Sequence, residues 1–103
     1  MNIKFNETDK LLTCRITEEI DHHTTERIRR ILDDEIEKYI PSKIVFDFEN
    51  VSFMDSAGIG MILGRYKLLK LVGGTVELIN VNSKIKKIFD MSGIQKIIQI
   101  NEM

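Results

Sequence analysis

Apolar and polar residues alternate in two short runs at the start of the chain, Asn2–Asn6 and residues 11–17. Every second residue from Leu12 to Ile16 is apolar, and this period of two is typical of a strand with one buried face. Residues 7–10 between the runs are all polar, as in a turn. The pattern therefore predicts that the chain begins with a β-hairpin.

The apolar spacing then changes to three and four residues, which is typical of an amphipathic helix that packs one face on a core. Asp21 precedes this segment and is suited to accept hydrogen bonds from the first helical amides. Pro41 cannot continue a helix and marks its end. The predicted apolar stripe consists of Ile28, Ile31, Leu32, Ile36 and Tyr39.

The most continuous apolar run, residues 43–48, predicts a central strand that is apolar on both sides until Asp47 and is covered by helices. A loop over residues 49–55 follows it. The next segment predicts a long helix that starts at or beside Ser56 and ends at the glycine pair beginning with Gly73. This helix is apolar nearly all round, so it is either enclosed or leaves a patch for another surface to cover.

The remaining segments predict a strand over residues 75–79, a short basic helix and a last strand over residues 97–100. Asn82 or Ser83 is suited to begin the short helix, and Gly93 to end it. Strands and helices alternate after the opening hairpin, which favours an α/β fold. We expect a mixed, mostly parallel β-sheet with an N-terminal hairpin and helices packed against it.

Composition limits the fold and the partners. The chain has 103 residues, 43% of them apolar, which suits one domain over residues 1–103. Its formal net charge of -1 argues against direct binding to nucleic acid or to an anionic membrane. No signal peptide is recognisable and no apolar run approaches the roughly 20 residues needed to cross a bilayer, so we expect a cytoplasmic protein. The single cysteine, Cys14, lies in an apolar alternating run and predicts an inert buried thiol.

Three glycines follow the central strand. Gly58, Gly60 and Gly64 have the spacing G-x-G-x-x-x-G, which differs from the G-x-G-x-x-G fingerprint of dinucleotide-binding folds. Each glycine costs a helix roughly 0.8–1 kcal/mol relative to alanine, so their accumulation indicates a close approach. Either a partner surface or the protein's own sheet could require it, and the sequence favours neither.

Catalytic interpretations of this segment are weak. Met54 stands where a nucleophile elbow around Ser56 would need its first glycine. Two adjacent histidines, His22 and His23, with no cysteine nearby are a weak metal signal. Asp55 could be a phosphate-accepting aspartate, but such a site needs further carboxylates to hold a metal, and we rank it below the serine. We therefore expect no enzymatic activity, no metal and no cofactor.

Ser56 has a better explanation as a regulatory residue. The first amides of a helix lack intrahelical acceptors, and the helix dipole places partial positive charge at that end. A phosphate on Ser56 would therefore be well placed, and we expect backbone amides to hold it. Asp21 and Asp55 should keep the surroundings negative. The sequence thus predicts that Ser56 is a phosphorylatable switch on a protein-binding surface.

Three motifs, SFMDSAGIGMILGRYK at residues 52–67, EEIDHHTTE at 18–26 and KKIFDMSGIQKII at 86–98, resemble the anti-sigma-factor antagonists of the STAS domain class, above all its sporulation members. In that family the serine matching Ser56 is phosphorylated by an ATP-dependent serine kinase that is also the anti-sigma factor. The resemblance implies that the unphosphorylated form binds this kinase and releases the sigma factor, and that a PP2C-type phosphatase regenerates it. We also expect a monomer without direct contact to nucleic acid or membrane.

The resemblance further implies a partner-binding surface in which the acidic turn lies beside the serine loop. Its expected members are Glu19, Asp21, His22, Asp55, Ser56, Ala57, Gly58, Ile59 and Gly60. Glu18 stands where the family usually has glycine, so the local backbone could differ. The alternative is a STAS module that binds a nucleotide or lipid at the turn from Gly58 to Gly60 and serves a transport or stress-signalling assembly.

Overall fold

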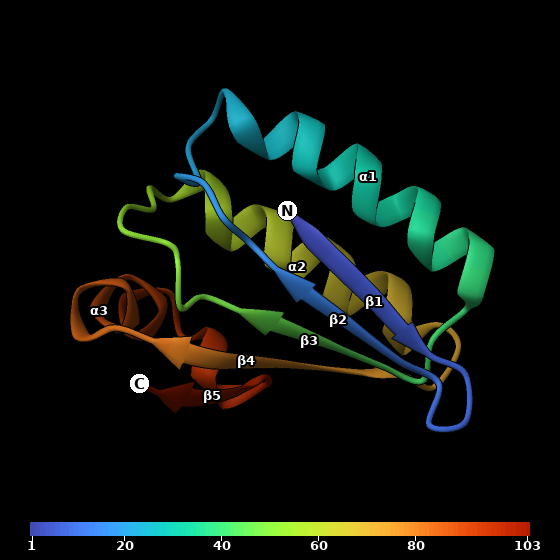
Figure 1. Cartoon of the computed structure of the whole chain (residues 1–103). Helices are drawn as coiled ribbons and strands as arrows, with labels where there is room; N and C mark the ends of the chain where they lie inside the picture. Colours follow the sequence, from blue (N-terminus) through green and yellow to red (C-terminus); the bar gives the residue numbers. More distant parts are fainter.

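The computed structural model describes residues 1–103 and has one five-stranded sheet with the strand order β1-β2-β3-β4-β5 (Figure 1). The strands are β1 (Asn2–Asn6), β2 (Leu11–Arg15), β3 (Lys43–Asp47), β4 (Thr75–Val81) and β5 (Gln99–Glu102). β1 pairs with β2 in antiparallel fashion, and all other neighbours are parallel. The predicted mixed sheet with an N-terminal hairpin is therefore confirmed.

The register of the sheet collects the core on one face. Cys14 lies beside Phe46, and Phe46 beside Leu78, and all three are fully buried. The opposite face carries Val45, which is only half-buried and has the polar Glu77 as its neighbour on β4. The prediction of a central strand covered on both sides is therefore wrong for this face, because alternate residues of the neighbouring strands are polar.

Three α-helices complete the fold: α1 (Thr24–Tyr39), α2 (Ala57–Lys70) and α3 (Ser83–Ser92), with a short 3-10 helix η1 (Ile94–Lys96). α1 and α2 lie side by side against the sheet, and α3 lies at the end where β3 and β4 terminate (Figure 1). The edge-to-face contact of Phe48 with Phe89, with ring centroids 5.6 Å apart, joins the end of β3 to α3. No helix combines the length and apolar character needed to span a membrane.

Helix ends follow the local sequence. The side chain of Asn82 accepts a hydrogen bond from the Ile85 amide at 2.9 Å and caps α3, and Gly93 ends α3 with a left-handed φ of 79°. Within α1 the burial of Ile28 and Leu32 is confirmed, whereas Ile31 is 36% exposed and lies outside the buried stripe. Three further boundaries differ from expectation: β2 stops at Arg15, β4 continues to Val81, and β5 starts only at Gln99, because the amides of Ile97 and Ile98 donate to the carbonyl of Ile94 in the turn that follows η1.

A two-bond backbone bridge joins two loops that are far apart in the sequence. The Ile20 amide donates to the carbonyl of Phe53 at 3.0 Å, and the Asp55 amide donates to the carbonyl of Ile20 at 3.0 Å. Ile20 and Met54 thereby form an isolated parallel β-bridge between the loop after β2 and the loop after β3. The acidic turn and the serine loop are thus held together at the carboxyl end of the parallel strands.

Gly58 is required by this bridge. A β-carbon at residue 58 would lie 2.5 Å from Sδ of Met54 and 3.1 Å from Cγ2 of Ile20, and both neighbours are buried. A β-carbon at Gly60 or Gly64 would meet no atom within 4 Å. Close approach of the protein's own chain therefore explains the first glycine and leaves the other two unexplained.

We expect Gly58→Ala to lower the free energy of unfolding by about 1–3 kcal/mol, because the added methyl group must displace the buried Met54. Gly60→Ala is the matched control, since its methyl group meets nothing and alanine is the better helix former, and it should gain about 0.5–1 kcal/mol. Urea unfolding followed by circular dichroism measures both values. Equal stability of the two variants would contradict the packing role of Gly58.

Candidate functional site

Ser56 occupies the N-cap position of α2, as the sequence predicts. Its backbone is helical, with φ -64° and ψ -17°, and its side chain makes no capping hydrogen bond. The residue is exposed. The hydroxyl is therefore neither buried in the core nor engaged in holding the helix, and another protein can reach it.

The amides next to Ser56 already have acceptors. Ala57 donates to Oδ1 of Asp55 at 2.8 Å. Gly58 donates to the carbonyl of Asp55 at 3.1 Å, and Ile59 donates to the carbonyl of Ser56 itself at 3.1 Å. The expectation that these amides would hold a phosphate is therefore wrong for this conformation. The helix dipole still favours negative charge here, but a phosphate on the exposed serine would extend toward solvent.

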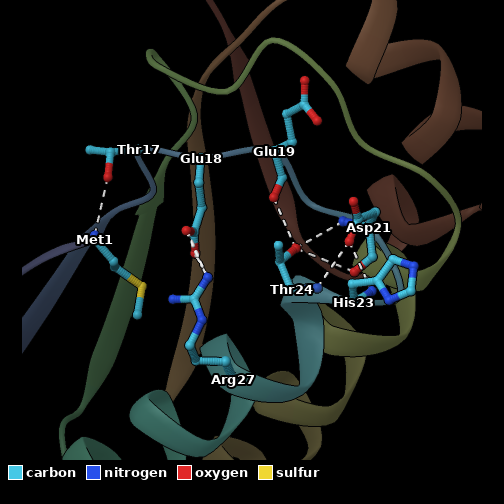
Figure 2. A network of polar contacts seen from close by, with 8 residues as sticks. All are labelled: Met1, Thr17, Glu18, Glu19, Asp21, His23, Thr24 and Arg27. Atoms are coloured by element: carbon cyan, nitrogen blue, oxygen red, sulfur yellow. Dashed lines mark hydrogen bonds and ion pairs between the residues drawn. The ribbon is translucent and has the colours of Figure 1, made fainter.

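The acidic turn before α1 is held by its own hydrogen bonds (Figure 2). The carboxylate of Asp21 accepts from the amides of His23 at 2.8 Å and Thr24 at 2.9 Å, so Asp21 acts at the helix start as expected. The hydroxyl of Thr24 donates to the carbonyl of Glu19 at 2.9 Å. Hydrogen bonds from the backbone of Thr24 and His23 hold the pKa of Asp21 below its ordinary value. The turn therefore presents a fixed, ionised carboxylate.

Glu18, the residue that replaces the glycine usual in the resembled family, has a structural role here. Nη2 of Arg27 lies 2.8 Å from both carboxylate oxygens of Glu18, which ties the loop to α1. The neighbouring carboxylate of Glu19 is exposed and points away from α1 (Figure 2). Glu18 thus fixes the turn, and Glu19 is free to face a partner.

The two loops bring their charges together around Ser56. Nδ1 of His22 lies 3.9 Å from Oδ2 of Asp55, so the acidic turn faces the serine loop across the bridge. The side chain of Asp55 is 34% exposed although it also accepts the Ala57 amide. The surroundings of Ser56 on this side are accordingly negative at neutral pH.

On its other side Ser56 borders an apolar hollow that sequence reasoning missed. A cavity of about 390 Å³ between α2 and α3 is lined by Ser56, Ile59, Ile88, Met91 and Ser92. Met91 is 89% exposed, and with Ile59 and Ile88 it supplies the apolar part of this lining. The sequence does hint at this exposure. Ile85 and Phe89 form the buried stripe of α3, and Met91 lies off that stripe. The serine therefore lies between an acidic turn and an apolar surface.

The sequence-predicted site residues fall into three groups. Glu19, His22 and Ser56 are exposed, and Asp21, Asp55, Ala57 and Ile59 are half-buried beside them. Gly58 is buried beneath Met54 and has a packing role, and its contact with a partner stays a prediction. Gly60 is exposed but opens toward α1, on the side of α2 away from the apolar hollow. No group of three or more metal-ligating side chains is present.

Comparison with known proteins assigns this arrangement to a family. The STAS domain model matches residues 2–102. The anti-sigma F factor antagonist of Paenibacillus polymyxa is 41% identical over 87% of this chain and 77% of its own length. The solved unphosphorylated form of the anti-sigma factor antagonist SpoIIAA has a TM-score of 0.84 at 32% identity and is matched over 96% of this chain and 85% of its own. The phosphorylated form of SpoIIAA from Bacillus has a TM-score of 0.74 at 32% identity over 96% and 88% of the two chains. The chain therefore belongs to the STAS domain family, as its motifs indicate.

Proposed function

We propose that this protein is an anti-anti-sigma factor whose activity is switched by phosphorylation of Ser56. Its unphosphorylated form binds an anti-sigma factor that is also an ATP-dependent serine kinase, and this binding releases the sigma factor. The observation that carries the proposal is the exposed, uncapped hydroxyl of Ser56 at the N-terminus of α2. The anti-sigma factor antagonists among its relatives, one solved in unphosphorylated and phosphorylated forms, support it.

The switch is electrostatic in this proposal. A phosphate adds about 1.5 to 2 negative charges at neutral pH and three acceptor oxygens. Asp55 directly precedes Ser56, the bridge between Ile20 and Met54 places Asp21 beside Asp55, and the amides at the start of α2 already have acceptors, so the new charge is added next to existing carboxylates. A partner site formed around a neutral hydroxyl would have to desolvate this charge. Binding is thereby lost while the hydrophobic core, which includes Ile20 and Met54 of the bridge, stays intact, because the exposed Ser56 side chain lies outside it.

The protein acts as a substrate and binding module in this scheme, and the groups that transfer the phosphoryl group belong to the kinase. A PP2C-type phosphatase reverses the modification. The exposed position of Ser56 suits both reactions, because each enzyme must enclose the serine side chain. The competing interpretation places a ligand at the turn from Gly58 to Gly60, but Met54 and Ile20 fill the space at Gly58.

We expect wild-type protein incubated with its kinase and ATP to gain one phosphate, seen by intact-protein mass. Ser56→Ala should gain none yet still bind the kinase, because the hydroxyl itself is not charged. Ser56→Asp should bind at least about tenfold more weakly, since it places a fixed charge beside Asp55. Phosphate on the exposed Ser52 or Ser92 instead, or tight binding by Ser56→Asp, would refute the proposal.

The apolar hollow gives a second test. Met91→Ala should weaken kinase binding by about tenfold, as expected for a large exposed side chain that becomes buried in an interface. Leu71→Ala is the control, because Leu71 is 83% exposed but lies beyond the far end of α2. Titration calorimetry with the unphosphorylated protein measures both affinities. Equal effects of the two variants would exclude α3 from the binding surface.

A further inference from the structure

The apolar pattern of α2 predicts either an enclosed helix or a patch that another surface covers, and the C-terminal end of the helix carries an open patch. Leu68, Leu71 and Val72 are exposed there, and Leu71 is 83% exposed. α1 and α2 lie side by side and finish at the same end of the sheet, where the exposed Ile40 follows α1 (Figure 1). We call these four residues the helix-end patch. Large apolar side chains that gather on one surface are typical of an interaction site.

A groove of about 440 Å³ lies within the helix-end patch, between the two helices. Its lining is apolar on both sides and acidic on the side of α1, and it consists of Asp33, Ile36, Glu37, Ile40, Leu68 and Val72. Ser56 lies at the opposite end of α2, roughly 20 Å away along a helix of 14 residues. The groove is therefore separate from the proposed switch and from the apolar hollow beside it.

Ile40 holds its place in this groove in a strained backbone conformation. Its φ of 45° and ψ of 61° are left-handed, which is unfavourable for a β-branched residue. The following residue, Pro41, favours an extended conformation at residue 40 and so adds to the strain. Glycine or asparagine is the usual residue where a helix ends in this way. Because the side chain of Ile40 is also 61% exposed, internal packing does not explain it, whereas contact with another surface does.

The two helices bring unpaired charges of opposite sign to the patch. Glu37 lines the groove from α1 and forms no ion pair within the chain. Lys67 lies one turn before Leu71 on α2, is exposed and forms no ion pair either. Lys70, by comparison, has its Nζ 3.3 Å from the hydroxyl of Tyr66. The apolar patch thus has a free carboxylate on one helix and a free ammonium group on the other.

This charge pattern favours a second copy of the chain over an anionic membrane. A membrane would attract Lys67 and Lys70 and take up Leu71, but it would bring Asp33 and Glu37 against a surface of like charge. A second copy supplies both signs, because the surface that needs them also carries them. A two-fold dimer requires a surface that is complementary to itself in this way.

We propose that two copies of this chain associate through the helix-end patch, about a two-fold axis that runs along the groove. In this arrangement α1 of each copy covers α2 of the other, so that the apolar side chains of the two patches bury one another. Glu37 lies three residues before the end of α1 at Ile40, and Lys67 lies four residues before the end of α2 at Leu71. Glu37 of one copy therefore faces Lys67 of the other at nearly the same level.

The dimer differs from the monomer expected from the sequence, and it does not depend on the proposed function. Ser56 stays exposed in both copies, because it lies at the other end of α2. Loss of the dimer should therefore leave kinase binding by each chain unchanged. Ser56→Asp should in turn leave the Kd of the dimer unchanged.

Sedimentation equilibrium of the full chain over a concentration series tests the proposal. The mass of the wild type should rise with concentration from that of one chain toward that of two. Leu71→Gln should raise the Kd of the dimer at least about tenfold, because it places an amide in the apolar contact. Its melting temperature, measured on dilute protein, should equal that of the wild type, because the side chain is already exposed. Ile97→Gln is the matched control, since Ile97 is exposed beside η1 and outside the patch, and its Kd should be unchanged.

Two further variants separate contact between copies from folding. Glu37→Lys and Lys67→Glu should each raise the Kd about fivefold, because like charges then face each other, and the double variant should regain the wild-type Kd. Rescue by this exchange requires contact between copies, since the two residues form no ion pair within one chain. Ile40→Asn should weaken the dimer about tenfold yet raise the melting temperature of dilute protein, because asparagine tolerates the left-handed conformation.

Several results would overturn the proposal. One is a wild-type chain that remains single at about 1 mM, and another is an equal loss of association in Leu71→Gln and Ile97→Gln. Failure of the double charge exchange to restore the Kd would overturn the two-fold arrangement. Binding to phosphatidylglycerol vesicles by a chain that remains single in solution would assign the patch to a membrane instead.

Discussion

The backbone bridge between Ile20 and Met54 is the interaction on which the proposed site depends. Its two hydrogen bonds fix the acidic turn against the serine loop, although the bridged residues lie 34 positions apart in the sequence. Without them, the carboxylate of Asp21 would have no defined position relative to Asp55 and Ser56, whereas Asp55 is held beside Ser56 by the chain and by the Ala57 amide. The bridge also explains why glycine is needed at residue 58, because its own neighbours occupy the space that a side chain would take.

The Ser56 hydroxyl is not part of the interactions that hold the fold together. The amides at the start of α2 are satisfied by Asp55 and by the chain itself, so the helix begins without help from the Ser56 hydroxyl. A modification of that hydroxyl therefore removes no structural hydrogen bond. The side chains that bind the sheet to its helices lie on the buried face, among Cys14, Phe46 and Leu78. Charge at the surface can change while packing does not.

Much of the fold could be predicted because its signals are local. Alternation identified the hairpin, and Asn82 and Gly93 marked the ends of α3 because capping needs only neighbouring residues. The features that were missed arise between distant segments. Gly58 could not be assigned to packing without knowing that Met54 lies over it, and the burial of Arg65 beside Asp33 depends on how α1 and α2 pack.

The same reasoning explains the partial success at the site. The sequence placed Ser56 at a helix N-terminus, but it could not show that Asp55 already occupies the Ala57 amide. It also could not show that Met91 of α3 lines the same hollow as Ser56, because α2, β4 and their connecting loops lie between the two residues in the sequence. Local chemistry was predictable, and the neighbours supplied by the fold were not.

The most direct test of the account is to measure kinase affinity and core amide hydrogen exchange on one sample before and after stoichiometric phosphorylation. The account predicts that affinity falls at least about a hundredfold, equivalent to roughly 2.7 kcal/mol, while amides of the buried β3 and β4 residues exchange at unchanged rates. Unchanged affinity, or a general loss of core protection on phosphorylation, would contradict a switch that acts through surface charge alone.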